Sequence, residues 1–396
     1  MLLFNEKKDC CGCGACFSVC PRNAISMEED ACGYVYPRID DTLCVECGKC
    51  RQVCAFQNHT ETNTPKEVYA AAAKSSDVIQ NAASGGIFTV LAEAVIDKGG
   101  VVFGAAFGED WSVQHTAAES KEQLQKLRGS KYTHSSTGDT FRQVQKLLKE
   151  GRYVLYSGTP CQIAGLYGFL GKAYENLLTV DLICHGVPSN RMFQDFVKAL
   201  EQKENGRVVS FSFRDKSMGW GKNGSAVIES GGKTYRKKLW ESASAYPYYF
   251  AKSLLSRENC YTCKYACANR PGDISLGDYW GIEKSHPEYL GKNGFDDTKG
   301  ISAVIANTDQ GKAALQLLQE TACMKESAFE AAASGNERLR HGSECSPRRA
   351  ELLALYEKDG WSALEKYHSD SVGLKKHMSF VKSLIPPALK RCLKRR

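Results

Sequence analysis

The spacing of apolar and polar positions changes several times along the chain, and each change predicts a different kind of element. Between residues 68 and 186, short apolar runs that end at turn residues alternate with segments of helical periodicity. Such runs are typical of buried strands, and strands that alternate with helices predict an α/β layer. The predicted strands are residues 68–74, 101–107, 152–158 and 177–186, and the predicted helices are residues 84–96 and 137–151.

Different patterns precede and follow this α/β region. Residues 207–216, 224–230 and 231–238 have the alternation of antiparallel strands with a Gly-Gly turn, and the chain beyond Thr308 has mostly helical periodicity. Residues 58–67 are polar, lack apolar periodicity and contain Pro65, which predicts a linker. The expected organisation is a compact front unit (1–57), this linker (58–67), a larger α/β domain (68–307) and a helical C-terminal region (308–396).

Composition narrows the class of protein. Among the 396 residues, 42% are hydrophobic and 24% are charged, as in ordinary globular proteins. No run of membrane-spanning length is free of charges, and the first residues lack the apolar core of a signal peptide. We therefore expect a cytoplasmic protein, in which the 18 cysteines are metal ligands or free thiols rather than disulfides.

The net charge of +7 is concentrated at the end of the chain, because no acidic residue follows Asp370. No nucleic-acid motif accompanies these charges, so nucleic acid is not an expected partner. A basic segment mixed with apolar residues can lie weakly on an anionic membrane surface, whereas Pro386 and Pro387 favour a solvated tail. The basic residues of the tail are Lys375, Lys376, Lys382, Lys390, Arg391, Lys394, Arg395 and Arg396.

A cysteine pattern occurs twice in the front unit. Each copy has the spacing C-x2-C-x2-C-x3-C, which is the spacing of bacterial ferredoxins that hold two [4Fe-4S] clusters. In those proteins the fourth cysteine of each run binds the other cluster. Carried over, this predicts an α+β ferredoxin-like domain with one cluster on Cys10, Cys13, Cys16 and Cys54 and another on Cys44, Cys47, Cys50 and Cys20.

Two other interpretations of these cysteines are weaker. Zinc sites use paired C-x2-C units separated by a longer loop, which two full four-cysteine runs fit poorly. Disulfides conflict with the cytoplasmic prediction. Cys11 and Cys32 lie outside the spacing and are expected to be free thiols.

The larger domain has cysteines of its own. Cys161 and Cys184 follow predicted strands, Cys260 and Cys263 form a C-x2-C pair, and Cys267 lies close behind. From spacing alone, these residues either converge on a third cluster or are buried structural cysteines.

The sequence between residues 66 and 307 resembles the family of coenzyme F420 hydrogenase/dehydrogenase beta subunits. The resemblance is carried by "SGGIFTVLA", "GSKY", "GTPCQIAGL", "DLICHGVPS" and "CYTCKYACANRPGDISLGDYWG". It implies a flavin-binding domain in which FAD lies beside one [4Fe-4S] cluster held by Cys161, Cys184, Cys260 and Cys263, with Cys267 as an extra candidate. The implied flavin contacts are Ser84, Gly85, Gly86, Gly129, Ser130, Lys131 and Tyr132.

The flavin contacts also agree with simple physical expectations. The "SGG" segment opens a predicted helix, and a helix N-terminus with small residues offers backbone N–H groups to a phosphate. Ser84 could equally be a helix N-cap, and Lys131 either pairs with a diphosphate or is a solvated charge.

These features predict an iron–sulfur flavoprotein oxidoreductase. Clusters carry single electrons and a flavin exchanges one electron or two, so the chain would pass electrons between a ferredoxin or redox subunit and a small organic substrate. His185 is a candidate proton donor, with a hydrogen bond to a backbone carbonyl as the alternative role. The alternative function is an electron-transfer subunit of a larger complex with no substrate of its own. Three clusters of four irons predict about twelve irons per chain.

Overall fold

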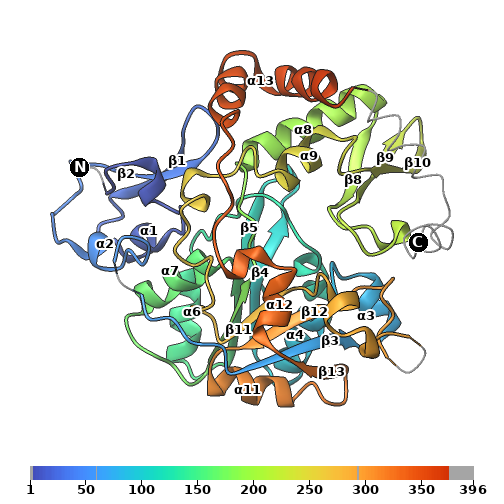
Figure 1. Cartoon of the computed structure of the whole chain (residues 1–396). Helices are drawn as coiled ribbons and strands as arrows, with labels where there is room; N and C mark the ends of the chain where they lie inside the picture. Colours follow the sequence, from blue (N-terminus) through green and yellow to red (C-terminus); the bar gives the residue numbers. More distant parts are fainter. Residues whose placement is uncertain (1–2, 59, 292–293, 374–396) are drawn as a thin grey trace.

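The computed structural model describes residues 3–58, 60–291 and 294–373. Its strands form a two-stranded hairpin, a three-stranded sheet and an eight-stranded sheet. In Figure 1 the hairpin lies in the blue front module at the left, the large sheet occupies the centre, and the three-stranded sheet lies at the right.

The front module (residues 3–58) is a small α+β unit, as the cysteine repeats predict. It contains η1 (Lys7–Asp9), α1 (Ala15–Val19), β1 (Ile25–Glu29), β2 (Val35–Ile39) and α2 (Lys49–Gln52), with β1 and β2 antiparallel. Gly14 and Gly48 precede the two helices at equivalent places of the repeats, with φ of 79° and 72°. This left-handed backbone favours glycine and lets each cysteine loop wrap around a common centre.

The large sheet has a parallel centre and antiparallel edges. Its order is β13-β3-β12-β11-β7-β6-β4-β5, and β4, β6, β7 and β11 are mutually parallel. The predicted α/β layer is therefore confirmed as a mixed sheet. The strands are β3 (Glu67–Ala73), β4 (Val101–Phe107), β5 (Val113–Ala118), β6 (Val154–Gly158), β7 (Leu177–Leu182), β11 (Ile274–Asp278), β12 (Ser302–Ala306) and β13 (Ala322–Ser327).

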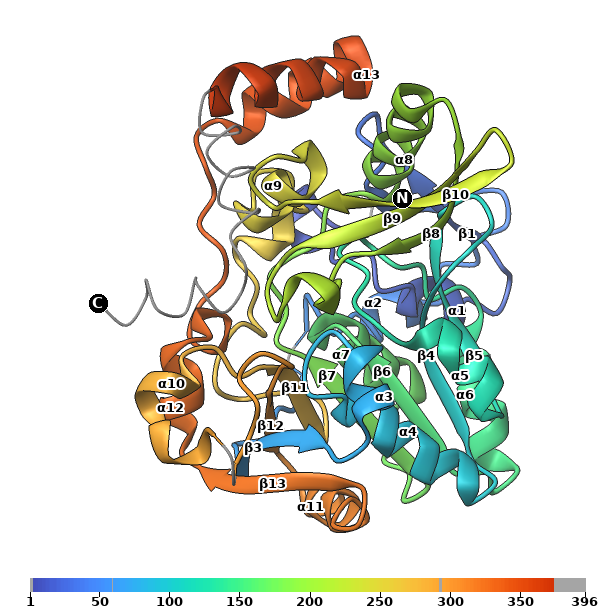
Figure 2. The same cartoon turned by 90° about the vertical axis from the view of Figure 1, so that its right-hand side faces the viewer.

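Helices cover both faces of this sheet, which explains why its central strands are mostly apolar. Val102 and Leu155 pack into a core with Leu91 of α4 (Ile87–Asp97), whereas Phe103 and Tyr156 pack into a second core on the opposite face. The second core includes residues of α6 (Thr140–Lys149) and α7 (Pro160–Leu170). Figure 2 shows α4 in front of the strands.

The three-stranded sheet and two long helices enclose an aromatic core. β8 (Arg207–Ser212), β9 (Gly224–Ser230) and β10 (Lys233–Leu239) are antiparallel, as predicted. Phe193 and Phe196 of α8 (Asn190–Glu204) meet Phe211, Tyr246 and Trp361 there. Tyr246 belongs to α9 (Ala245–Ala251) and Trp361 to α13 (Arg349–Val372).

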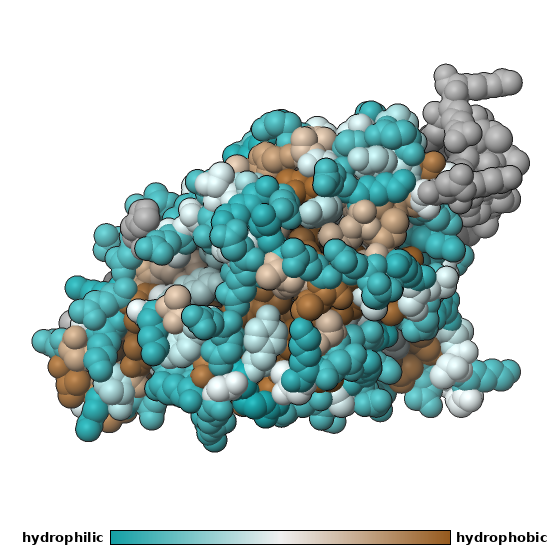
Figure 3. All heavy atoms as spheres, turned by 90° about the horizontal axis from the view of Figure 1, so that it is seen from below, coloured by the Kyte–Doolittle hydropathy of each residue, from teal (hydrophilic) through white to brown (hydrophobic). Residues whose placement is uncertain are grey.

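Loops carry the remaining short elements. These are α3 (Ser76–Gln80), α5 (Lys121–Leu124), η2 (Gln125–Leu127), η3 (Lys216–Met218), η4 (Glu258–Cys260), α10 (Ile282–Ser285), η5 (Pro287–Tyr289), α11 (Asp309–Gln316), α12 (Phe329–Ser334) and η6 (Glu337–Leu339). Seen from below, polar side chains cover most of the surface and many apolar ones lie in recesses between them (Figure 3).

One sequence-based expectation needs correction. The chain beyond Thr308 is mostly helical, but β13 pairs with β3 and makes this region part of the large sheet. Within the predicted linker (58–67), Asn63 forms a bridge with Arg270 and Glu67 begins β3. No helix among the described residues is long and apolar enough to cross a membrane. The basic tail from Lys375 onward lies outside the described residues.

Candidate functional site

The cysteines of the front module surround two separate hollows. Cys10, Cys13, Cys16 and Cys54 line one, which we call the proximal hollow. Cys20, Cys44, Cys47 and Cys50 line the other, which we call the distal hollow. The chain thus brings together the two sets that the crossed ferredoxin pattern predicts, with Cys50 also touching the proximal hollow.

The thiols around these hollows suit iron–sulfur clusters. Among the described residues, no three His, Cys, Asp or Glu side chains lie close enough to hold one metal ion. Thiolates that share a zinc ion stand about 3.8 Å apart, because each lies about 2.3 Å from it. In a cubane each thiolate binds a different iron, so four thiols around a hollow suit a [4Fe-4S] group.

A third set of cysteines meets at the carboxyl edge of the large sheet, in what we call the central hollow. Cys161 lies in the first turn of α7 after β6, Cys184 follows β7, Cys260 ends η4, and Cys263 lies in the next loop; all four line this hollow. Burial raises the pKa of Cys184 to about 12 and that of Cys263 to about 11. Without a metal these thiols stay protonated, so a bound cluster would supply the charge that holds them as thiolates.

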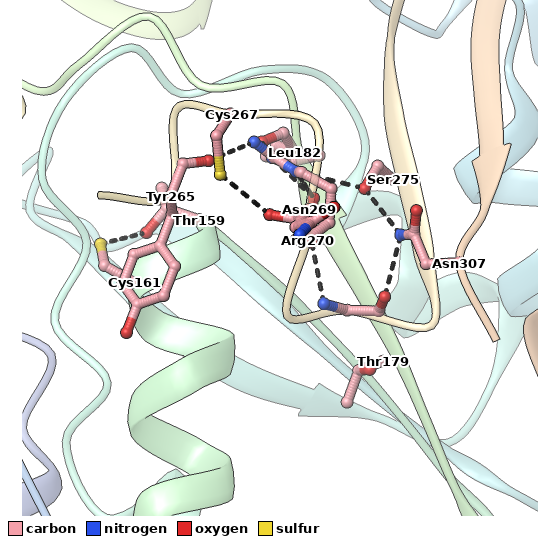
Figure 4. Close-up of polar contacts among 12 residues, drawn as sticks. Thr159, Cys161, Thr179, Leu182, Tyr265, Cys267, Asn269, Arg270, Ser275 and Asn307 are labelled. Atoms are coloured by element: carbon pink, nitrogen blue, oxygen red, sulfur yellow. Dashed lines mark hydrogen bonds and ion pairs between the residues drawn. The ribbon is translucent and has the colours of Figure 1, made fainter. Parts of the chain in front are cut away.

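Cys267 does not line the central hollow. Its thiol donates to the backbone oxygens of Asn269 at 3.1 Å and Lys264 at 3.4 Å. Figure 4 shows its sulfur directed toward Asn269, whereas Cys161 lies on the other side of Tyr265 and contacts the Thr159 hydroxyl at 3.2 Å. The geometry thus favours Cys263 over Cys267 as the fourth thiol of this set.

Cys11, expected to be a free thiol, lies between two hollows. It is buried, lines both the proximal and the central hollow, and packs in one core with Cys13 and Cys161. The cysteine spacing does not indicate this position, because Cys11 of the front module contacts Cys161, 150 positions later in the sequence, only in the folded chain. Cys32, the other extra cysteine, is buried and donates to the Leu353 oxygen.

The front module is seated directly on α7. A Cβ on Gly165 would lie 2.7 Å from the Cys13 sulfur, and one on Gly168 would lie 2.4 Å from the Val53 oxygen. Such distances leave no room for a side chain, so the two glycines allow the module to approach the helix. The proximal and central hollows are consequently neighbours.

A cavity of about 500 Å³ opens on the other side of the central hollow. This volume lies within the usual range for cofactor and ligand sites. Six of the seven predicted flavin contacts line it: Ser84, Gly86, Gly129, Ser130, Lys131 and Tyr132. Gly85 does not, because it is packed against the Ala71 oxygen and its N–H donates to the Ser302 hydroxyl at 3.0 Å.

At the start of α4, the N-cap is not the residue that the sequence analysis considered. Gly86, with φ of 82°, is the N-cap of the helix. The Ser84 hydroxyl donates to the Ile301 oxygen at 2.9 Å, so it is not the helix cap. Ser84 and Gly86, which precede α4, therefore face the cavity beside Ile87 and Phe88 of its first turn, and a helix N-terminus of this kind can bind a phosphate group.

Lys131 and Tyr132 form a second wall. Burial lowers the pKa of Lys131 to about 7, and its ammonium group donates to the oxygens of Lys126 and Arg128 at 3.0 and 2.9 Å. The ring of Tyr132 stacks on Phe250 with centroids 4.3 Å apart. A positive group and a flat aromatic surface therefore lie side by side at the cavity.

Sequence reasoning missed an ion pair in this cavity. Arg214 donates to both carboxylate oxygens of Asp278, at 2.8 and 3.1 Å, and to the Tyr132 hydroxyl at 2.9 Å. The indole of Trp220 donates to the same carboxylate at 2.7 Å and stacks on Trp280 at 4.8 Å. Asp278 ends β11, so the sheet edge fixes this group in place.

His185 lies where the central hollow and the cavity meet. Its Nε2 is 3.2 Å from the Ala251 oxygen and 3.0 Å from the Ser253 hydroxyl, and burial lowers its pKa to about 4. A neutral ring that donates to a backbone oxygen matches the alternative role foreseen for it. A role as proton donor stays a prediction.

The four spaces form an uninterrupted series through the molecule. The distal and proximal hollows share Cys50, and the proximal and central hollows share Cys11. The central hollow and the cavity share Cys184 and His185. Groups bound in these spaces would be close neighbours in a fixed order.

Three segments of the chain match families of known proteins. Residues 151–332 match the C-terminal part, and residues 68–141 the N-terminal part, of the family described as the beta subunit of coenzyme F420 hydrogenase/dehydrogenase. Residues 9–58 match a 4Fe-4S dicluster domain.

Two curated relatives and one solved structure are similar to the chain. An uncharacterised protein of Methanocaldococcus jannaschii is 25% identical over 321 residues, which cover 72% of this chain and 83% of that protein. A protein of Methanosarcina mazei, the F subunit of its F(420)H(2) dehydrogenase, is 22% identical over 209 residues, or 48% of this chain and 58% of that protein. A chain of the F420-reducing [NiFe] hydrogenase complex from Methanosarcina barkeri aligns with a TM-score of 0.43 and 17% identity, covering 77% of this chain and 92% of that chain.

Proposed function

The chain belongs to the family of coenzyme F420 hydrogenase/dehydrogenase beta subunits and carries a 4Fe-4S dicluster domain, and from this premise we propose that it is the iron–sulfur electron-transfer subunit of a larger redox complex. In this role it relays single electrons between a partner protein and a flavin-type cofactor. Family membership and the dicluster domain support an oxidoreductase that works with iron–sulfur groups.

The observation that carries the proposal is the series of four spaces. Each of three hollows contains one predicted set of four thiols, the fourth space has the size of a cofactor site, and each neighbouring pair shares a lining residue. Electron transfer needs redox groups held close together in a fixed order. Metal sites that only stabilise the fold would not need to lie next to one another in this way.

The surface of the distal hollow supports an outside partner. Cys47 is exposed there, and its neighbour Val45 leaves 58% of its surface in contact with solvent. The proximal hollow, by contrast, is lined by the buried thiols of Cys10 and Cys13. Electrons would therefore enter or leave the chain through the distal hollow.

The cavity suits FAD at the other end of the relay. The small residues at the start of α4 would face the phosphates, Lys131 would pair with their charge, and Tyr132 and Trp280 would bound the flat ring system. When bound, a flavin exchanges electrons singly with clusters and in pairs with an organic molecule. The chain's residues would bind and orient it, and the neighbouring Arg214–Asp278 ion pair lies in the same wall.

A catalyst that acts alone on a small organic substrate is the other function compatible with this site. The cavity favours it in one respect, since its walls also include Lys222 and Arg338, beyond the residues expected to contact a flavin. The two functions differ in what the isolated chain does. An electron-transfer subunit needs its partner for turnover, whereas an independent reductase does not.

Anaerobic purification of the full chain, with iron, sulfide and flavin quantified, tests the proposal. We expect about twelve irons per chain and one flavin, together with a stable complex with another redox protein when the chain is isolated from its native cells. About eight irons would remove the central cluster from the proposal. Turnover of a small molecule by the isolated chain with reduced ferredoxin would replace the electron-transfer role by the independent enzyme.

A further inference from the structure

Arg257 is a completely buried arginine between the proximal and central hollows, and the relay described above gives it no role. It is 1% exposed and directly precedes η4, the turn that carries Cys260. Its backbone N–H donates to the Val187 oxygen at 2.8 Å, which ties it to the loop after Cys184. The backbone of Arg257 is therefore held by the same two segments that carry Cys184 and Cys260 of the central hollow.

The side chain of Arg257 reaches into the front module. Its Nε–H donates to the Cys10 oxygen at 2.9 Å, and its guanidinium lies 4.0 Å from the centre of the Tyr36 ring. Gly12 makes room for it, because a Cβ there would lie 3.3 Å from the guanidinium carbon. One buried Nη atom of the group has no hydrogen-bond partner.

The charge of Arg257 has no carboxylate partner within ion-pair distance in the described part of the chain. The other buried arginines do: Arg270 pairs with Asp181 at 2.7 Å, and Arg214 pairs with Asp278 at 2.8 Å. Removing an unpaired charge from water is strongly unfavourable, so a buried arginine of this kind needs a compensating negative group. The thiols whose charges it faces are those of Cys10, Cys11 and Cys260.

We propose that Arg257 is a shared countercharge of the proximal and central clusters and raises the reduction potential of both. The inference rests on the cluster positions proposed above. Cys10 belongs to one thiol set and Cys260 to the other, so a single guanidinium faces both. Arg257 is a positioning residue here, since it acts on the clusters through charge and a backbone contact rather than by binding iron.

The sign of the effect follows from charge. A cluster becomes more negative by one unit when it accepts an electron, and a fixed positive charge in a poorly solvated place stabilises that state. The distal cluster would lie farther from Arg257 than the proximal one and is more exposed to solvent. Arg257 therefore raises its reduction potential less. Electrons that enter at the distal cluster would thus be drawn toward the proximal and central clusters.

The test replaces Arg257 in the full chain and measures midpoint potentials by anaerobic redox titration followed by electron paramagnetic resonance. Arg257→Gln removes the charge, and Arg257→Lys keeps it. Arg349→Gln is a matched control, because Arg349 also joins the front module to the rest of the chain, contacting the Tyr34 ring and the Ser256 oxygen, and faces no thiol of the three sets. Iron content is measured first, so that loss of clusters is separated from a change of potential.

In Arg257→Gln we expect the reduction equilibria of two clusters to weaken by about tenfold, equivalent to 59 mV for a one-electron couple, with the third unchanged. Arg257→Lys and Arg349→Gln should stay within about twofold of the unsubstituted protein. If Arg257→Gln does not assemble, assembly of Arg257→Lys with unchanged potentials still supports the role of charge. Three results would overturn the proposed role of Arg257: unshifted potentials in an iron-replete Arg257→Gln, equal shifts in Arg349→Gln, or potentials in Arg257→Lys as low as those in Arg257→Gln. An unsubstituted chain without iron would overturn the proposed function instead.

Discussion

The crossed arrangement of the front-module cysteines can be tested by pairing substitutions. Cys10 and Cys54 line the proximal hollow, although they come from different repeats, whereas Cys20 lies in the same repeat as Cys10 and lines the distal hollow. The double variant Cys10→Ala/Cys54→Ala therefore removes two ligands of one cluster. The matched variant Cys10→Ala/Cys20→Ala removes one ligand from each of two clusters.

The iron content of the two variants should differ by one whole cluster. With four irons per cluster, Cys10→Ala/Cys54→Ala is expected to keep about eight of about twelve irons, and Cys10→Ala/Cys20→Ala to keep about four. Both variants carry the same number and type of substitutions, so general destabilisation of the module affects them alike. Iron and acid-labile sulfide per chain after anaerobic purification are the quantities to measure.

The reverse order of iron contents would show that each repeat holds its own cluster. Equal contents of about four irons would show that the two front clusters assemble only together, as a single cooperative unit. Either result would refute the expectation that the hollows fill separately with crossed ligands. Cys32→Ala, which removes a cysteine outside both hollows, should keep about twelve irons.

Three further predictions concern the larger domain. Cys263→Ala should lose about four irons and Cys267→Ala none, because only Cys263 lines the central hollow; equal losses would contradict this assignment. The affinity for FAD should fall by roughly fivefold, equivalent to about 1 kcal/mol, as the pH rises through the Lys131 pKa of about 7; it should be flat in Lys131→Met, as measured by fluorescence titration, because the neutral amine no longer attracts a diphosphate. Burial lowers the pKa of His115 and His185 to about 4 and that of His134 to about 3, so the unfolded chain binds more protons below its own histidine pKa of about 6.5. The free energy of unfolding in denaturant should therefore fall by about 4 kcal/mol from about pH 7.5 to about pH 5.5, and an unchanged value would show that these rings are charged in the folded protein.

Apolar periodicity predicts the centre of the large sheet but not its edges. The runs that become β3, β4, β6 and β7 are mostly apolar because helices cover both faces, and β7 also buries the polar side chains of Thr179 and Asp181. β13, with the sequence ACMKES, carries polar residues at an edge, and its pairing with β3 joins segments about 250 residues apart. Neither its local pattern nor any neighbouring turn indicates that pairing.

The same division holds for the candidate site. Cluster-binding cysteines can be recognised in the sequence, because the geometry of a cluster requires short and regular spacing between them. Arg214 and Asp278 lie 64 positions apart, and Arg257 is one of many arginines until burial and the absence of a carboxylate partner among the described residues set it apart. Charged residues that meet only in the folded chain cannot be recognised from the residues next to them in the sequence.

The seating of the front module against Gly165 has a kinetic consequence. A donor bound through a transient encounter delivers electrons at a rate that falls on dilution, because it must find its partner for every transfer. In the proposed relay the donor belongs to the same chain, and the Cys13 sulfur packs against Gly165 of α7. Transfer within the chain is then a first-order event, indifferent to how scarce the protein is, and only the exchange with the outside partner depends on concentration.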